Sequence, residues 1–157
     1  MLIHEMTPEE CGAALTRVDF GRLACARDDQ PYVVPIHFVY DGKHLYGLTT
    51  AGQKIDWMRS NPHVCLEIDE RASHHQWMSI VVLGRYEELP ETPACEHARA
   101  HALNLLQQRR ELWWQPVSVS RPGRNQRAPI FYRIHVLQIT GLRAEPDAIE
   151  ATTPAAD

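Results

Sequence analysis

The chain has 157 residues, of which 44% are hydrophobic and 23% charged, a composition that excludes a fibrous or largely disordered protein. Its formal net charge of −4 and its scattered basic residues give no positive field for nucleic acid or an anionic membrane, so neither is an expected partner. We expect one domain over residues 1–143, followed by a disordered tail at 144–157 that has little to bury.

The sequence also indicates in which cellular compartment the protein is expected. The first ten residues carry acids and a proline, whereas a secretory signal needs a basic start and an apolar run. The apolar-rich stretch at 32–40 is about half the length that a membrane helix requires. The four cysteines lie far apart, without the close spacing of metal ligands, and are expected as reduced thiols. These features predict a cytoplasmic protein.

The first half of the chain alternates short strands with turns. Thr7, Pro8 and Glu10 have the spacing of a capped helix start and predict a helix that runs to about Arg17. Strands are then expected at 21–26, 32–40 and 44–50, the last two joined by a hairpin turn at Asp41 and Gly42. A short helix is expected over 52–60. It ends there because Pro62 disfavours a helical conformation at the residue before it.

The second half contains the long strands and the longest helix. Alternating apolar residues predict strands at 63–69, 77–88 and 130–140, and a helix that opens at Thr92 and ends near Trp113. In total the sequence predicts six strands and three helices, and their order does not follow the strand–helix–strand alternation of βαβ folds. This indicates an antiparallel barrel with helices at its rim. Glycine motifs of dinucleotide folds, P-loops and α/β-hydrolases are missing from the sequence.

One stretch has the chemistry of a phosphate cradle. Thr49, Thr50, Gly52 and Lys54 lie where a predicted strand passes into a helix, so hydroxyls, free N–H groups and an ammonium face one point. The alternative is an ordinary turn that caps the helix, with Lys54 in solvent and no ligand.

The order of several segments carries a family resemblance. They are residues 20–24 (FGRLA), 31–35 (PYVVP), 45–46 (LY), 52–54 (GQK), 61–62 (NP), 82–85 (VLGR), 131–134 (FYRI) and 139–141 (ITG). This order resembles the FMN-binding split-barrel superfamily that includes the pyridoxamine 5′-phosphate oxidases, and more closely its nitroimidazole-reductase-like branch. The resemblance covers about residues 7–143 and implies a mainly β fold, a six-stranded antiparallel split β-barrel with rim helices.

The resemblance also implies a homodimer with FMN at its interface. The residues that match the strand beside the isoalloxazine ring are Val34, Pro35, Ile36 and His37. The residues that match the segment holding the phosphate are Thr49, Thr50, Gln53 and Lys54. The oxidases carry an arginine where this chain has Gln53, and their pyridoxal-phosphate recognition set is not visible, so that reaction is not assigned.

Other aromatic and histidine residues leave alternatives open. Trp113 could cover a flavin face or pack in the core or dimer interface. His37 could donate to flavin, accept a substrate proton, or be an ordinary barrel histidine with a satisfied hydrogen bond. His97 and His101 have the spacing of zinc ligands, but without a third ligand an exposed helix surface is favoured, and no metal is predicted.

The first functional interpretation is an FMN-dependent oxidoreductase that passes electrons from a reduced nicotinamide to a small oxidised substrate, such as a nitro compound. No catalytic acid or base is assigned, because FMN itself would supply the redox chemistry. The second interpretation is a non-catalytic protein that binds FMN, deazaflavin or haem in the same barrel. The third is a dimeric structural domain whose ancestral site is empty.

Overall fold

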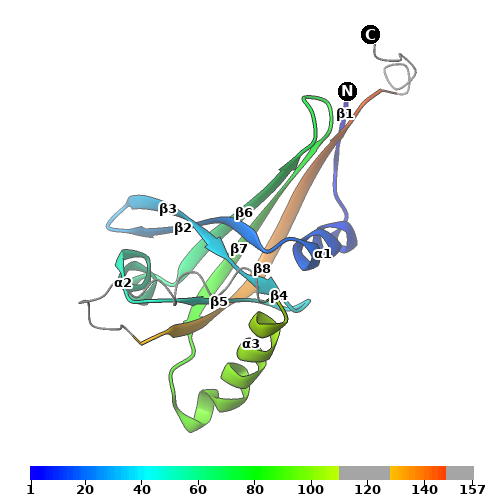
Figure 1. The fold of residues 1–157 in the computed structure, drawn as a ribbon. Helices are drawn as coiled ribbons and strands as arrows, with labels where there is room; N and C mark the ends of the chain where they lie inside the picture. Colours follow the sequence, from blue (N-terminus) through cyan, green and yellow to red (C-terminus); the bar gives the residue numbers. More distant parts are fainter. Residues whose placement is uncertain (110–127, 148–157) are drawn as a thin grey trace, which may run out of the picture.

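A computed structural model describes residues 1–109 and 128–147 of the chain (Figure 1). Within these ranges the strands are β1 (Leu2–Glu5), β2 (Phe20–Arg27), β3 (Gln30–His37), β4 (Val39–Tyr40), β5 (His44–Thr49), β6 (His63–Arg71), β7 (Trp77–Glu88) and β8 (Ile130–Glu145). The helices are α1 (Pro8–Arg17), α2 (Gln53–Ser60) and α3 (Glu96–Gln108), with a single 3₁₀ turn, η1 (Pro93–Cys95), before α3. No described helix is long and apolar enough to span a membrane.

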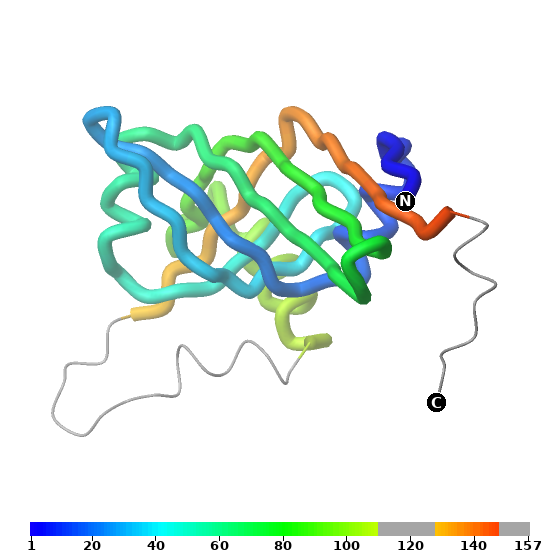
Figure 2. Tube along the Cα trace, turned by 90° about the horizontal axis from the view of Figure 1, so that it is seen from above, coloured from blue at the N-terminus to red at the C-terminus, as the bar shows by residue number. Residues whose placement is uncertain are grey.

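All strands belong to one antiparallel sheet in the order β3-β2-β6-β7-β8-β5-β4, with β1 added beside the end of β8. The edge strands β3 and β4 are consecutive along the chain, so the sheet must curl round on itself, as Figure 2 shows from above. Phe38 separates them, and its N–H donates to the carbonyl of Asp19 at 2.9 Å. The predicted antiparallel split barrel is confirmed: β3 pairs only with β2, and the sheet stays open between β3 and β5.

The strand count differs from the six predicted, for two reasons. The predicted strand at 32–40 is divided at Phe38, because its first part pairs with β2 and its last two residues pair with β5. The short strand β1 was not predicted, since four residues at the chain start carry little pattern. It pairs with the end of β8, which extends to Glu145 instead of stopping at 140.

Strand β8 extends into the segment that the sequence predicts as a disordered tail. Ala144, expected in a disordered tail, is 1% exposed and pairs with Trp77 of β7, while residues 148–157 lie outside the described ranges. Helix α3 ends at Gln108, where the N–H of Arg109 donates to the carbonyl of Leu106 at 3.1 Å. The prediction that it continues to Trp113 falls on residues outside those ranges.

Helix α1 begins as the sequence predicts. The Thr7 hydroxyl accepts from the Glu10 N–H at 3.2 Å, and the Glu10 carboxylate accepts from the Thr7 N–H at 2.8 Å. These two bonds satisfy backbone donors that the first helical turn leaves free. The buried face of α1, with Leu15 at its centre, packs onto the barrel core.

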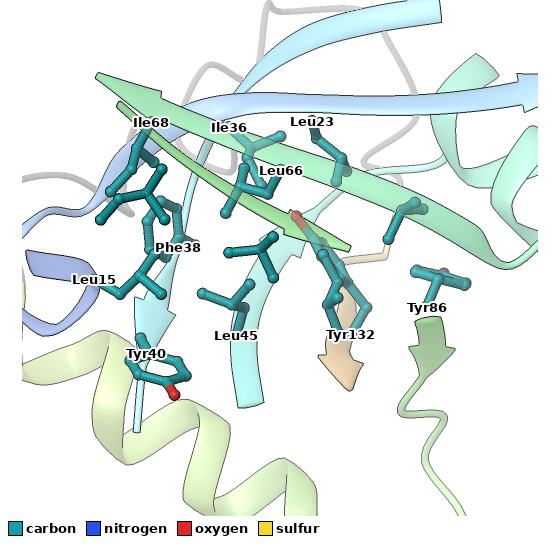
Figure 3. Close-up of a cluster of buried hydrophobic side chains, with 14 of the residues drawn as sticks. Leu15, Leu23, Ile36, Phe38, Tyr40, Leu45, Leu66, Ile68, Tyr86 and Tyr132 are labelled. Atoms are coloured by element: carbon teal, nitrogen blue, oxygen red, sulfur yellow. The ribbon is translucent and has the colours of Figure 1, made fainter. Parts of the chain in front are cut away.

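The core fills the barrel interior with aliphatic and aromatic side chains from every long strand (Figure 3). Tyr132 of β8 is the largest fully buried side chain and crosses the position of Gly47 on β5, its direct neighbour in the sheet. A methyl group at Gly47 would clash with the Tyr132 ring and its hydroxyl. Glycine is therefore required at position 47 to seat this ring.

The change Gly47→Ala should destabilise the fold by about 1–3 kcal/mol, because the added methyl overpacks the core against Tyr132. Urea denaturation of the purified variant measures the loss. Gly12→Ala is the matched control, since Gly12 lies within helix α1 with open space around it, and alanine there should stabilise by about 0.5–1 kcal/mol. Equal stabilities of the two variants would contradict the packing argument.

Candidate cofactor site

A cavity of about 200 Å³ lies where the sheet is open between β3 and β5. Its lining comes from six elements and comprises Phe20, Pro35, Ile36, His37, Leu48, Thr49, Lys54, Leu106 and Tyr132. The opening of the barrel thus brings together a strand wall, the start of α2 and the end of α3. Five of the residues predicted from the sequence, namely Pro35, Ile36, His37, Thr49 and Lys54, are among this lining.

The strand wall of the cavity is mostly apolar. Phe20 and His37 are paired directly across β2 and β3, and their ring centroids are 5.1 Å apart with the rings tilted by 58°. Pro35 lies two residues before His37 on the edge strand β3, a position where a missing N–H costs no ladder hydrogen bond. Leu48 and Leu106 add aliphatic surface. Apolar and aromatic walls of this kind suit a flat organic ligand.

His37 brings an unsatisfied polar atom to this wall. Its Nδ1 is buried and has no hydrogen-bond partner among residues 1–109 and 128–147. A buried polar nitrogen without a partner costs about 1–3 kcal/mol, and such groups are rare in folded proteins.

Lys54 brings an uncompensated amine. It is the second residue of α2, half-buried, and the described part of the chain offers it no hydrogen bond or ion pair. Burial lowers the pKa of its amine from the usual value, an effect only partly opposed by the neighbouring Cys25 thiol. No side chain caps α2, so the N–H groups of its first turn point the positive end of the helix dipole toward the same region. Together these groups favour an anion such as a phosphate.

Helix α2 is held firmly against the β2–β3 hairpin. Trp57 packs on the Tyr32 ring with centroids 5.4 Å apart, and the Arg27 guanidinium lies over the Trp57 ring at 5.2 Å. The Asn61 amide at the end of the helix donates to the carbonyl of Ala26 at 3.0 Å. Ile55, next to Lys54, is fully buried in the core. The backbone that carries Lys54 is therefore fixed relative to β3.

Helix α3 is anchored to the barrel by its polar side chains. His101 bonds Asp41 at 3.0 Å and its ring meets Tyr46 edge-on, while Arg99 donates to the carbonyl of Leu89 at 2.6 Å. The exposed surface expected for His101 therefore also serves as an attachment point, which places Leu106 over the cavity.

Among the described residues, no group of three or more His, Cys, Asp or Glu side chains could hold a metal ion.

The remaining predicted site residues lie elsewhere. Val34 packs against the core and Thr50 is half-buried, but neither lines the cavity, and Gln53 is exposed on the first turn of α2. Trp113 lies outside the described residues. The binding roles of all nine residues stay predictions.

The sequence reasoning missed four cavity residues: Phe20, Leu48, Leu106 and Tyr132. Phe20 and Tyr132 do occur in segments that carry the family resemblance, but only as marks of the fold. Leu106 belongs to a helix far away in the sequence, and no local pattern indicates that it reaches the opening.

A curled antiparallel sheet, open between β3 and β5 where Lys54 and His37 line a mostly apolar cavity, defines a protein of the flavin-binding split-barrel fold. The chain belongs to the pyridoxamine 5′-phosphate oxidase family, which it matches over residues 7–143.

Known proteins similar to this chain agree with that assignment. An uncharacterised protein of Rhizobium meliloti, RA0666, is 46% identical over 147 residues, which cover 92% of this chain and 97% of the relative. The crystal structure of an FAD-binding protein of Mesorhizobium loti is 39% identical, with a TM-score of 0.75 over 93% of this chain and 99% of that one.

The crystal structure of a Bacteroides thetaiotaomicron protein, described by inference as a 5-nitroimidazole antibiotic resistance protein, is more distant. It is 18% identical with a TM-score of 0.63 and covers 93% of each chain, so it supports the fold alone.

Replacing Lys54 with methionine should stabilise the ligand-free protein at neutral pH, because it removes a half-buried charge that has no partner among the described residues. The folded-state pKa of Lys54 lies below its unfolded value, so the cost of burial is greatest at low and neutral pH and fades as the pH rises toward 10.5. Urea denaturation at several pH values should therefore show the gain from Lys54→Met shrinking in alkali. A destabilised variant at neutral pH would contradict this account.

Proposed function

We propose that the protein binds FMN in the cavity between β3 and β5 and uses it to pass electrons from a reduced nicotinamide to a small oxidised acceptor, such as a nitro compound. The observation that carries the proposal is that Lys54, which has no hydrogen bond or ion pair among the described residues, lines the same cavity as the apolar and aromatic side chains of β2, β3 and β5. Bound FMN would supply the redox chemistry, and the chain would supply binding and orientation.

The residues present fit such a group. Lys54 and the N–H groups that open α2 would hold the phosphate, and Thr49 lies beside them at the end of β5. Pro35, Ile36 and His37 would lie along the ring. The relative from Mesorhizobium loti is named an FAD-binding protein, which supports a flavin. We favour the mononucleotide because Lys54 is the single lysine or arginine among the described residues that line the cavity.

We further propose that the working form is a cytoplasmic homodimer. The cavity, at about 200 Å³, is smaller than the roughly 300–1,000 Å³ typical of sites for organic ligands, so one chain does not enclose the cofactor. Val33, Ala24, Cys65 and Leu83 are direct neighbours across four strands and form an apolar row on the outer face of the sheet. Val33 is 58% and Leu83 44% exposed.

This apolar row is continuous with the cavity. Side chains of a strand alternate between its two faces, so Val33 shares the outer face of β3 with Pro35 and His37. A second copy seated on the row would therefore reach the open side of the cavity. Its apolar surface would cover the exposed leucine and valine side chains, as in the core of a stable interface.

A non-catalytic binder of flavin, deazaflavin or haem is the second candidate. It is favoured by the cavity lining, which contains no carboxylate and no thiol among the described residues. The absorption spectrum of the purified protein distinguishes flavin from haem. Oxidation of NADH or NADPH by the flavin-loaded protein, with a panel of nitro and quinone acceptors, distinguishes an enzyme from a binder. No turnover with any acceptor would contradict the oxidoreductase.

Lys54→Met should weaken FMN binding at least about tenfold, because a charge-assisted hydrogen bond to phosphate is lost. Riboflavin, which has no phosphate, should bind the variant and the original protein equally. Fluorescence titration measures both ligands, and Lys43→Met at the exposed β4–β5 turn is the matched control. If Lys54→Met weakened riboflavin and FMN to the same degree, the phosphate role would be wrong.

Leu83→Asp should convert the homodimer to a monomer and weaken FMN binding, because it places a charge in the centre of the apolar row. Light scattering coupled to gel filtration gives the mass. Leu103→Asp is the control, since Leu103 is comparably exposed but lies on α3 away from the row. A monomeric original protein that binds FMN tightly would contradict the interface.

A further inference from the structure

The chain contains two lysines, and they lie in opposite environments. Lys43 is exposed in the turn between β4 and β5. Lys54 is half-buried, lines the cavity and starts a helix whose dipole opposes a positive charge at that end. The two side chains provide an internal comparison of the same amine with and without solvent.

The groups around Lys54 do not compensate its charge. On β2 it faces Cys25, whose thiol is buried and has its pKa raised by that burial, so the thiol stays neutral at physiological pH. On β3 and β8 the cavity presents His37 and Tyr132, and burial likewise raises the pKa of the Tyr132 phenol. Helix α3 contributes Leu106. With no carboxylate among these lining groups, the neutral amine is favoured more than in an exposed lysine.

A neutral amine in an apolar cavity is a nucleophile for carbonyl groups. We propose that Lys54 of the flavin-free protein captures a small aromatic aldehyde in this cavity by reversible formation of an imine. The cavity volume of about 200 Å³ suits a single ring, and Phe20, Pro35 and Leu48 provide apolar contacts for it. The inference depends on the proposed function only in that FMN and the aldehyde share the cavity.

The step needs no oxidant or reductant. The Nζ lone pair forms a bond to the carbonyl carbon while the C–O π bond opens, which gives a carbinolamine. The carbonyl oxygen then leaves as water together with the two amine hydrogens, and a C=N bond remains.

The test uses the full-length flavin-free protein with benzaldehyde and sodium cyanoborohydride, which reduces the imine to a stable benzylamine. Peptide mapping by mass spectrometry gives the labelling rate at each amine. At pH 7, Lys54 should be labelled at least about tenfold faster than Lys43, because the cavity holds the aldehyde beside the Lys54 amine, whereas Lys43 lies in solvent. Prior addition of FMN should protect Lys54 and leave Lys43 unaffected.

Two variants make the result specific. Lys54→Arg keeps a positive charge but removes the reactive amine, so the fast labelling should disappear, while circular dichroism confirms the fold. Lys43→Arg should leave the fast labelling unchanged.

Equal labelling of the two lysines, or slower labelling of Lys54, would overturn the inference. FMN binding without fast Lys54 labelling would refute the inference and leave the proposed function standing. Fast labelling without FMN binding or protection would support the amine chemistry and refute the flavin site.

Discussion

At Phe38 the backbone leaves one edge of the sheet and joins the other. Its side chain is 2% exposed in the core and its N–H is bonded to Asp19, so the crossing point is fixed from both sides. Residues before it pair with β2 and residues after it pair with β5. The opening that remains between β3 and β5 forms the cavity. The same backbone crossing at Phe38 therefore both closes the barrel and forms the candidate site.

The described lining of the cavity contains few polar groups. Most of its wall is apolar, and the Lys54 amine and His37 Nδ1 have no hydrogen-bond partner among the described residues. Each is a cost to the ligand-free fold. A site of this kind trades stability for binding, as functional sites often do. The cost is tolerable because α2 and β3 are secured by contacts outside the cavity, among them the Trp57–Tyr32 ring pair.

Much of the barrel could be predicted from the sequence, because alternation and turn residues are local signals. The capped start of α1, the Asp41–Gly42 turn and the long β6–β7 pair belong to this class. The division at Phe38 could not be predicted, since the apolar pattern runs through it without a break and only the choice of partner strand changes. Strand β1 was missed because four residues gain their structure from β8, over 130 residues away.

The candidate site was partly predictable for the same reason. Lys54 and His37 lie in segments with recognisable order, whereas Leu106 and Tyr132 reach the cavity through packing that no short stretch of sequence records. Gly47 shows the limit most clearly. Its position in β5 is unremarkable by pattern, yet the ring of Tyr132 occupies the space where a side chain would stand.

The attachment of Lys54 to a helix, while the flat wall belongs to strands, makes the two halves of the cavity separately adjustable. Substitutions along the first turn of α2 would change the charge at one end of the cavity and leave the strand wall intact. Substitutions in β3 would do the reverse. The charge and the apolar wall can therefore change independently, because they belong to different elements.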